Sequence, residues 1–100
     1  MKSRNSRTPT QAEAARQVAL GALAFLAGDP EHIGPFLAES GLSPADLRGV
    51  AGSAAFHVAL LDYMINRQDL LVAYAGEARI EPGHVVAARD LLFHADISEP

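Results

Sequence analysis

Apolar residues recur every three to four positions over most of this chain, which is the period of a helix that packs one face against a core. The clearest case is the segment 53–66, where Phe56, Leu60 and Tyr63 share one face. Ser53 precedes them as a capping residue. Other apolar residues extend this surface to nearly all sides: Val58, Leu61 and Ile65. We therefore expect this segment to be the central helix.

A first helix is predicted to end near Ala27. Its start is either Thr8, followed by proline, or the capping box of Thr10 and Glu13. Its second half, residues 18–27, is apolar on all sides, so we expect other elements to surround it. This run is about half as long as a membrane-spanning helix, and we expect no membrane association.

Three stretches join a capping position to a proline, which is the pattern of a helix start because proline needs no donor in the first turn. The candidate helix-start residues are Asp29, Pro30, Ser43, Pro44, Glu81 and Pro82. Gly41 is the candidate helix-stop residue, since glycine readily takes the left-handed conformation that ends a helix.

Shorter helices are predicted for residues 30–40 and 44–51, and Pro35 is expected to force a kink or a new start in the first of them. Asp69 is predicted to begin another helix, and Pro82 the last one. No segment shows the alternation of a strand, and alanine, the best helix former, supplies 19 residues. The fold class is therefore predicted to be all-α.

The expected architecture is a compact single-domain bundle of five or six helices with short turns that proline initiates. The helical domain is expected to cover residues 9–95. A flexible basic N-terminal tail (residues 1–8) would precede it, and a C-terminal tail (residues 96–100) would follow it.

Cysteine is absent, which excludes disulfides, thiolate zinc sites and a cysteine nucleophile. The basic N-terminus is not followed by the apolar run of a secretory signal, so we expect a cytoplasmic protein. The net charge of −4 becomes −7 when Lys2, Arg4 and Arg7 are set aside, because 5 basic residues then face 12 acidic ones. Such a domain repels phosphate backbones, which disfavours nucleic acid as a partner.

One alternative function is a nucleic-acid-binding regulator that uses residues 36–50, because LAESGLSPADLRGV resembles the turn of helix-turn-helix proteins. Ala38 lies three residues before Gly41, whereas that class usually has its alanine four residues before the glycine. The predicted reading helix offers Arg48 beside Asp46, although base edges and phosphates call for several donors and cations. Both features disfavour this alternative.

The second alternative is a metal- or ligand-binding helical protein in which folding brings His57 to His84 or Asp62. His57 and Asp62 are five residues apart, beyond the spacing at which helical side chains meet, and no HExxH motif is present. The sequence also lacks a GxxxxGK[ST] phosphate loop and a GxSxG elbow. We therefore predict no enzyme activity, no catalytic or metal-binding residue and no cofactor.

The first helix carries more apolar surface than a domain of this size easily buries. The residues concerned are Ala14, Ala15, Leu20 and Leu23. Gly21 lacks a side chain and is expected to let a neighbouring helix come close. We therefore predict a protein–protein interaction or adaptor module whose partner is an unknown protein or, as a homo-oligomer, a second copy of the chain.

Two stretches, ALAFLAGDPEHIGPFLAESGLSPADLR and LLDYMINRQDLLVAYAGEARIEPGHV, resemble a family of small alphaproteobacterial proteins catalogued as domain of unknown function 3572. The resemblance covers roughly residues 18–92. It implies a compact all-helical protein without an established activity, so no catalytic role is carried over. Related sequences tend to have glycine where this chain has Arg79, which disfavours a left-handed helix end there and makes Gly76 the expected stop.

Overall fold

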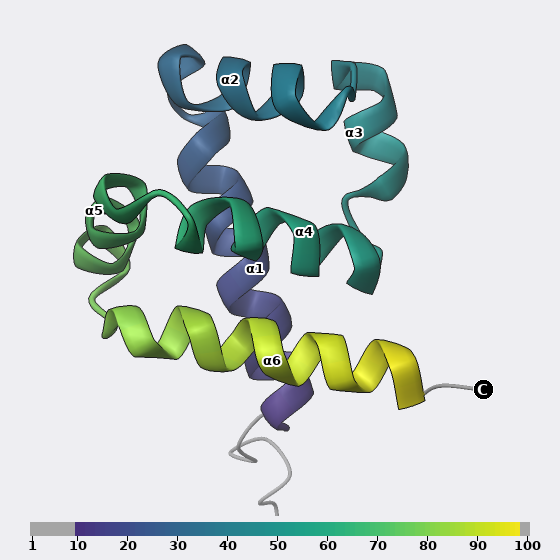
Figure 1. The fold of residues 1–100 in the computed structure, drawn as a ribbon, viewed down its shortest axis with the longest axis vertical. Helices are drawn as coiled ribbons and strands as arrows, with labels where there is room; N and C mark the ends of the chain where they lie inside the picture. The colour runs from purple at the N-terminus through teal and green to yellow at the C-terminus, as the bar shows by residue number, and fades with distance from the viewer. Residues whose placement is uncertain (1–9, 99–100) are drawn as a thin grey trace, which may run out of the picture.

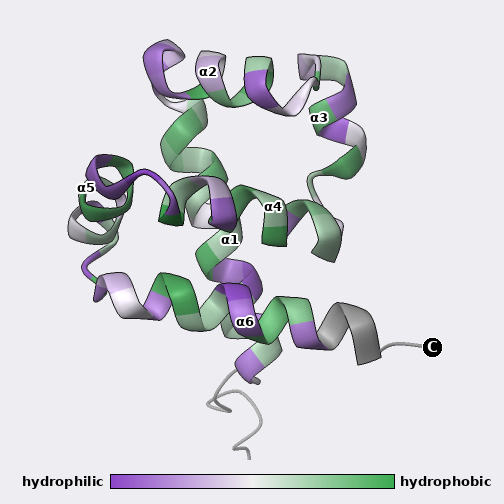
Figure 2. Cartoon of the chain, in the orientation of Figure 1, coloured by the Kyte–Doolittle hydropathy of each residue, from purple (hydrophilic) through white to green (hydrophobic). Residues whose placement is uncertain are grey.

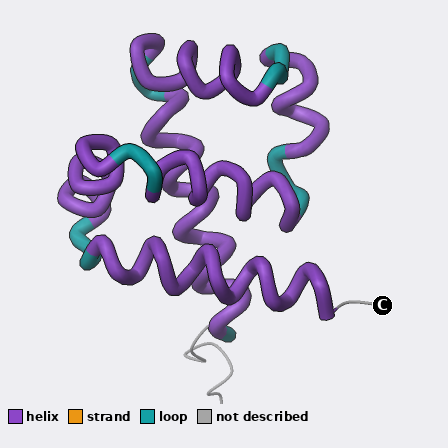
Figure 3. The backbone as a smooth tube through the Cα atoms, viewed as in Figure 1, coloured by secondary structure: helices purple, strands orange, loops and turns teal. Residues whose placement is uncertain are grey.

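Six helices follow one another along the chain in the computed structural model, which describes the backbone of residues 10–98 and the side chains of residues 10–94 (Figure 1). They are α1 (Gln11–Ala27), α2 (Pro30–Ser40), α3 (Pro44–Val50), α4 (Ala54–Ile65), α5 (Gln68–Ala78) and α6 (Pro82–Ser98). No strand occurs within residues 10–98 (Figure 3). The predicted all-α bundle is confirmed.

Helices α1, α4 and α6 pack against one another and form the core. In Figure 1, α4 lies next to α6, and α1 crosses behind both. The fully buried side chains on α1 are Ala15, Ala19, Ala22 and Leu26. Those on α4 and α6 include Leu60, Leu61, Met64, Val85, Ala88 and Leu92. Because α1 contributes mainly alanines, close helix packing replaces large side chains at this centre.

Residues 30–50, which we call the α2–α3 arm, are held much more loosely. Phe36 is the only fully buried residue of α2, and α3 has none. The Phe36 ring lies edge-on to Tyr63 at 5.0 Å and to Phe56 at 6.0 Å between centroids. Several half-buried apolar residues of the arm add to this contact: Ile33, Leu37, Leu47 and Val50. The arm is therefore anchored to α4 mainly through one aromatic side chain.

Local hydrogen bonds fix the helix starts. Thr10 and Glu13 form the reciprocal capping box of α1, with both bonds at 3.1 Å, whereas the other predicted start, Thr8, lies outside the described residues. Ser43 and Asp46 form the same box on α3, with Pro44 at the first helical position. A further cap on α4 comes from the hydroxyl of Ser53.

The other predicted start and stop residues also lie at helix ends. The Asp29 carboxylate accepts a hydrogen bond from the Glu31 N–H at 2.9 Å, one residue before Pro30 begins α2. Gly41 ends α2 with a φ of 76°. Helix α6 begins at Pro82, directly after Glu81.

Two helix boundaries differ from the sequence-based expectation, namely the start of α5 and the end of α6. Of the two alternatives predicted for Pro35, a kink or a new start, the new start is excluded because helix α2 continues through this residue. Pro35 has no N–H to donate a hydrogen bond to the carbonyl of Glu31. Both residues are exposed, so water can donate to that carbonyl instead. Helix α5 begins at Gln68, with Asp69 inside its first turn. The last helix extends to Ser98, three residues beyond the predicted end of the domain at residue 95.

The end of α5 corrects a third expectation. Arg79, not Gly76, is the helix stop, and it adopts φ 61° and ψ 44°. The Ile80 N–H donates to the Ala75 carbonyl at 3.0 Å, and the Arg79 N–H donates to the Gly76 carbonyl at 3.3 Å. These two bonds form a Schellman motif, which requires a left-handed residue at this position whatever its side chain.

Replacing Arg79 with glycine is therefore expected to raise the free energy of unfolding by about 0.5–1 kcal/mol, because glycine takes this conformation without a steric cost. Urea denaturation would measure the change. Arg16, an exposed arginine inside α1, is the matched control. The same substitution there is expected to lower stability by about 1 kcal/mol. A loss of stability at both positions would contradict this account of the α5 end.

Candidate functional site

Most polar side chains singled out in the sequence serve the architecture. His57 is buried, and its Nε2 lies 2.7 Å from the carbonyl oxygen of Ala51, where α3 ends. A carbonyl at a helix end lacks an intrahelical donor, so His57 supplies that donor from α4. Asp62 instead pairs with Arg89, whose Nε lies 2.7 Å from its Oδ1. The structure thus gives His57 and Asp62 separate partners.

No group of three or more histidine and carboxylate side chains that could hold a metal ion occurs among the residues that the structure describes. The hydrogen bonds that Arg89 donates to Asp62 and Asp90 raise the pKa of its guanidinium above the ordinary value. Arg89 therefore keeps its charge and ties α6 to α4.

The α2–α3 arm also holds the residues of the nucleic-acid alternative. Arg48 is exposed on α3, and Asp46 is engaged in the cap of that helix. Glu39 on α2 forms an ion pair with Arg67, whose guanidinium lies 4.0 Å above the Tyr63 ring. This pair reinforces the anchor of the arm.

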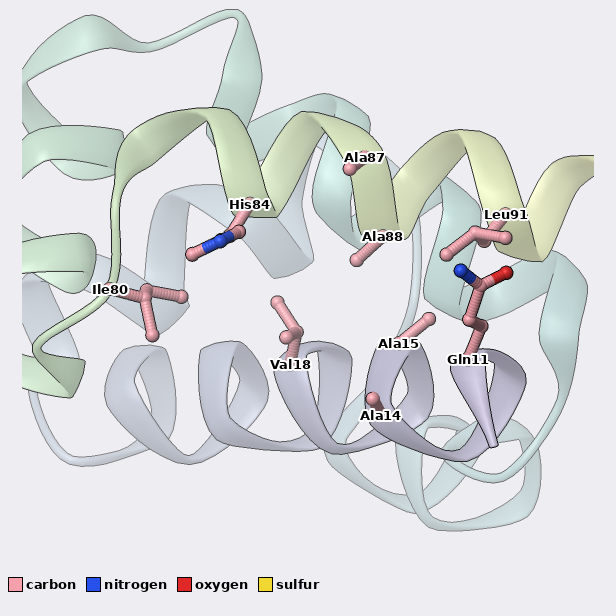
Figure 4. A pocket seen from close by; sticks show the side chains of 9 residues that line it. All are labelled: Gln11, Ala14, Ala15, Val18, Ile80, His84, Ala87, Ala88 and Leu91. Atoms are coloured by element: carbon pink, nitrogen blue, oxygen red, sulfur yellow. The ribbon is translucent and has the colours of Figure 1, made fainter. Parts of the chain in front are cut away.

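The most distinctive surface feature is an apolar groove between α1 and α6, with a volume of about 300 Å³ (Figure 4). Helix α1 lines it with Gln11, Ala14, Ala15 and Val18. Helix α6 lines it with His84, Ala87, Ala88 and Leu91, and Ile80 comes from the connection before α6. We call these nine residues the α1–α6 groove. None of them is Asp, Glu, Lys or Arg, although these types make up 20% of the chain.

Small residues give the groove its shape. Ala15 and Ala88 are buried, whereas Ala14 and Ala87 are exposed and leave space above them. The larger side chains of Val18 and Leu91, and that of Ile80, are half-buried.

His84 is the polar side chain near one end of the groove, and Figure 4 shows its ring pointing from α6 toward the space between the helices. The Glu81 N–H lies 3.4 Å from Nδ1 of His84 and donates to it. A ring nitrogen that accepts a proton donor carries no hydrogen itself, so this contact leaves the hydrogen of the neutral ring on Nε2. His84 therefore offers the groove one N–H donor.

A second hollow of about 320 Å³ lies further along the same side of α1. Its lining comes from α1 and α5: Gly21, Ala24, Phe25, Tyr74, Glu77 and Ala78. We call it the α1–α5 hollow. The hydroxyl of Tyr74 donates to the Val18 carbonyl at 2.8 Å, between the groove and the hollow. Burial raises the pKa of Tyr74, so this hydroxyl keeps its proton in neutral solution.

The sequence located only part of this surface. Ala14 and Ala15 of the predicted apolar set line the α1–α6 groove, whereas Leu20 and Leu23 do not. Leu20 is 41% exposed, so residues 18–27 are not surrounded on all sides, although Figure 2 shows that part of α1 as mostly hydrophobic. The side of the groove that α6 forms was not predicted from the sequence. Its signal is a second stripe beside the buried one: His84, Ala87 and Leu91.

None of the helices within residues 10–98 is both long and apolar enough to cross a membrane. Neither a curated protein nor a solved structure matches the chain. A family model described as "Protein of unknown function (DUF3572)" matches residues 12–95, which is most of the sequence. The chain therefore belongs to the DUF3572 family.

Proposed function

We propose that this protein is an interaction module that acts by contact rather than by catalysis, and that the α1–α6 groove is the surface where its partner docks. The observation that carries the proposal is the uncharged lining of the groove in a chain with one charged residue in five. Exposed apolar surfaces of this kind are commonly binding sites for another protein. Nothing in the structure or the comparisons favours the nucleic-acid or metal-binding alternatives.

The shape of the groove favours a helix as its occupant. Small and apolar side chains of the crossing helices α1 and α6 line the groove, and an amphipathic helix can lay its apolar face against such a surface. Ala14 and Ala87 lack the bulk that would keep another backbone away. The occupant is therefore proposed to be an amphipathic helix of another protein. A bacterial cytoplasmic setting is part of the same proposal.

A photoreactive amino acid at position 87 would test this function in extracts of cells that make the protein. The expected result is one dominant cross-linked protein that is absent when the reactive residue replaces Ala38, an exposed alanine on α2. The purified partner should then bind the Ala38→Glu variant like the wild type and lose binding to Ala87→Glu. Equal cross-linking at both positions would contradict the proposal.

Self-association is a separate outcome of the same experiment, because a second copy of the chain would appear as a cross-linked dimer. Light scattering over a hundredfold range of concentration would then show an increase in mass. A dimer that persists in Ala87→Glu would place the contact between copies outside the groove and contradict the proposed docking surface.

A further inference from the structure

Resting on the proposed docking function, we propose that the helix in the α1–α6 groove carries a basic residue about two turns beyond its apolar anchor, and that this residue pairs with Glu77. The interaction surface then covers both the groove and the α1–α5 hollow. The partner is an amphipathic helix with a cationic end.

The groove and the hollow are aligned along α1. Five of the seven residues of α1 that line them recur every three to four positions and so lie on one side of the helix: Gln11, Ala14, Val18, Gly21 and Phe25. Corresponding positions, such as Ala14 and Gly21, are seven residues apart, which is about 10 Å along a helix axis. A partner helix that follows α1 therefore meets both depressions within two turns.

The α1–α6 groove and the α1–α5 hollow differ in charge. The groove lining has no Asp, Glu, Lys or Arg, whereas Glu77 borders the hollow and is exposed. No ion pair or side-chain hydrogen bond of Glu77 occurs among the described residues. Arg79 lies two residues further along, in the left-handed turn that ends α5, and it forms no ion pair with Glu77. Glu77 is thus a carboxylate open to a partner's cation.

The folded part of the chain as a whole is negatively charged. Residues 10–94 contain ten acidic residues and five arginines, which gives 5 − 10 = −5 with neutral histidines. Two of these arginines, Arg67 and Arg89, are already paired within the fold. The surface field therefore attracts cationic partners and repels acidic ones.

Fluorescence anisotropy with designed peptides would test the inference. The probes are labelled alanine- and glutamine-based helices of about 18 residues with three leucines at i, i+4 and i+7, since shorter helices are marginal in water. One peptide has a lysine about two turns before the leucines, a second has it two turns after them, and a third has glutamine in its place. The two lysine peptides allow for both directions of binding.

One lysine peptide is expected to bind the wild type about two- to fivefold more tightly than the glutamine peptide, which is the range of exposed ion pairs. The difference should disappear in Glu77→Gln and shrink as salt is added. Ala87→Glu should weaken all three peptides at least about tenfold, because it places a charge in an apolar groove. Ala38→Glu should behave as the wild type.

The results separate this inference from the function on which it rests. If neither lysine peptide exceeds the glutamine peptide, or if its advantage persists in Glu77→Gln, the pairing with Glu77 is wrong. The docking groove still stands in that case, provided that Ala87→Glu loses binding and Ala38→Glu does not. If no peptide binds at millimolar concentration, or if both variants bind like the wild type, the inference and the docking groove both fail.

Discussion

Replacing Phe36 with alanine is expected to lower the free energy of unfolding by about 3–5 kcal/mol, the usual cost of removing a buried aromatic ring. Phe36 is 3% exposed and packs edge-on against Phe56 and Tyr63. Without this ring the arm retains half-buried apolar contacts, the stacking of His32 on Phe25 and the ion pair between Glu39 and Arg67. Urea denaturation would measure the loss.

The matched control is Leu37→Ala, because Leu37 lies next to Phe36 on α2 but is only half-buried. Its expected cost is smaller. Hydrogen exchange shows where the effect is largest: amides of α2 and α3 in the Phe36 variant should lose more protection than those of α1, α4 and α6. An equal fall of protection in all helices would show that the α2–α3 arm does not open as a separate unit.

Gly21→Ala is expected to destabilise the protein by about 1–3 kcal/mol, although alanine favours a helix over glycine by about 1 kcal/mol. A Cβ atom at this position would lie 2.5 Å from the hydroxyl oxygen of Tyr74. The ring must then move, and the bond from this hydroxyl to the Val18 carbonyl is strained or lost. Thermal unfolding followed by circular dichroism would measure the effect.

Tyr74→Phe provides the control, since it removes the clashing oxygen and leaves the nearest ring carbon, Cζ, at an ordinary 3.5 Å from the added Cβ. This variant alone is expected to cost about 1 kcal/mol for the lost hydrogen bond. In its background, Gly21→Ala should become neutral or stabilising. Additive costs in the double variant would mean that Gly21 does not serve the approach of α5 to α1.

Much of the fold could be predicted because its signals are local. Ser43 and Asp46 lie three residues apart, and the backbone of one helical turn brings them together wherever the chain folds. The same holds for Thr10 and Glu13. These hydrogen bonds do not depend on the rest of the molecule, so the sequence alone shows where these helices begin.

The end of α5 could not be predicted because its cause is not local. Arg79 has no intrinsic preference for a left-handed conformation. The chain adopts it because α5 must stop and turn for α6 to reach α1 and α4, and the bonds from Arg79 and Ile80 to α5 carbonyls stabilise the turn. The usual signal, a glycine, is missing, so the pattern pointed to Gly76 instead.

Only part of the candidate site could be predicted from the sequence, for a related reason. Ala14 on α1 and Ala87 on α6 both line the groove, yet 73 positions separate them and neither residue type is unusual. An apolar helix pattern shows that a helix is buried somewhere but not which side remains open. Leu20 illustrates this, because it belongs to the apolar half of α1 and still reaches solvent.

The placement of the two tyrosines has a spectroscopic consequence. The chain contains no tryptophan, so its near-ultraviolet emission comes mainly from Tyr63 and Tyr74. The Tyr63 ring lies beneath the Arg67 guanidinium, where the α2–α3 arm packs on α4. The Tyr74 hydroxyl links α5 to α1 through its hydrogen bond to the Val18 carbonyl. The molecule thus carries one tyrosine at each of two contacts between helices. The single variants Tyr63→Phe and Tyr74→Phe would each leave one of them to report, without a label, on occupation of the surface along α1 or on movement of the arm.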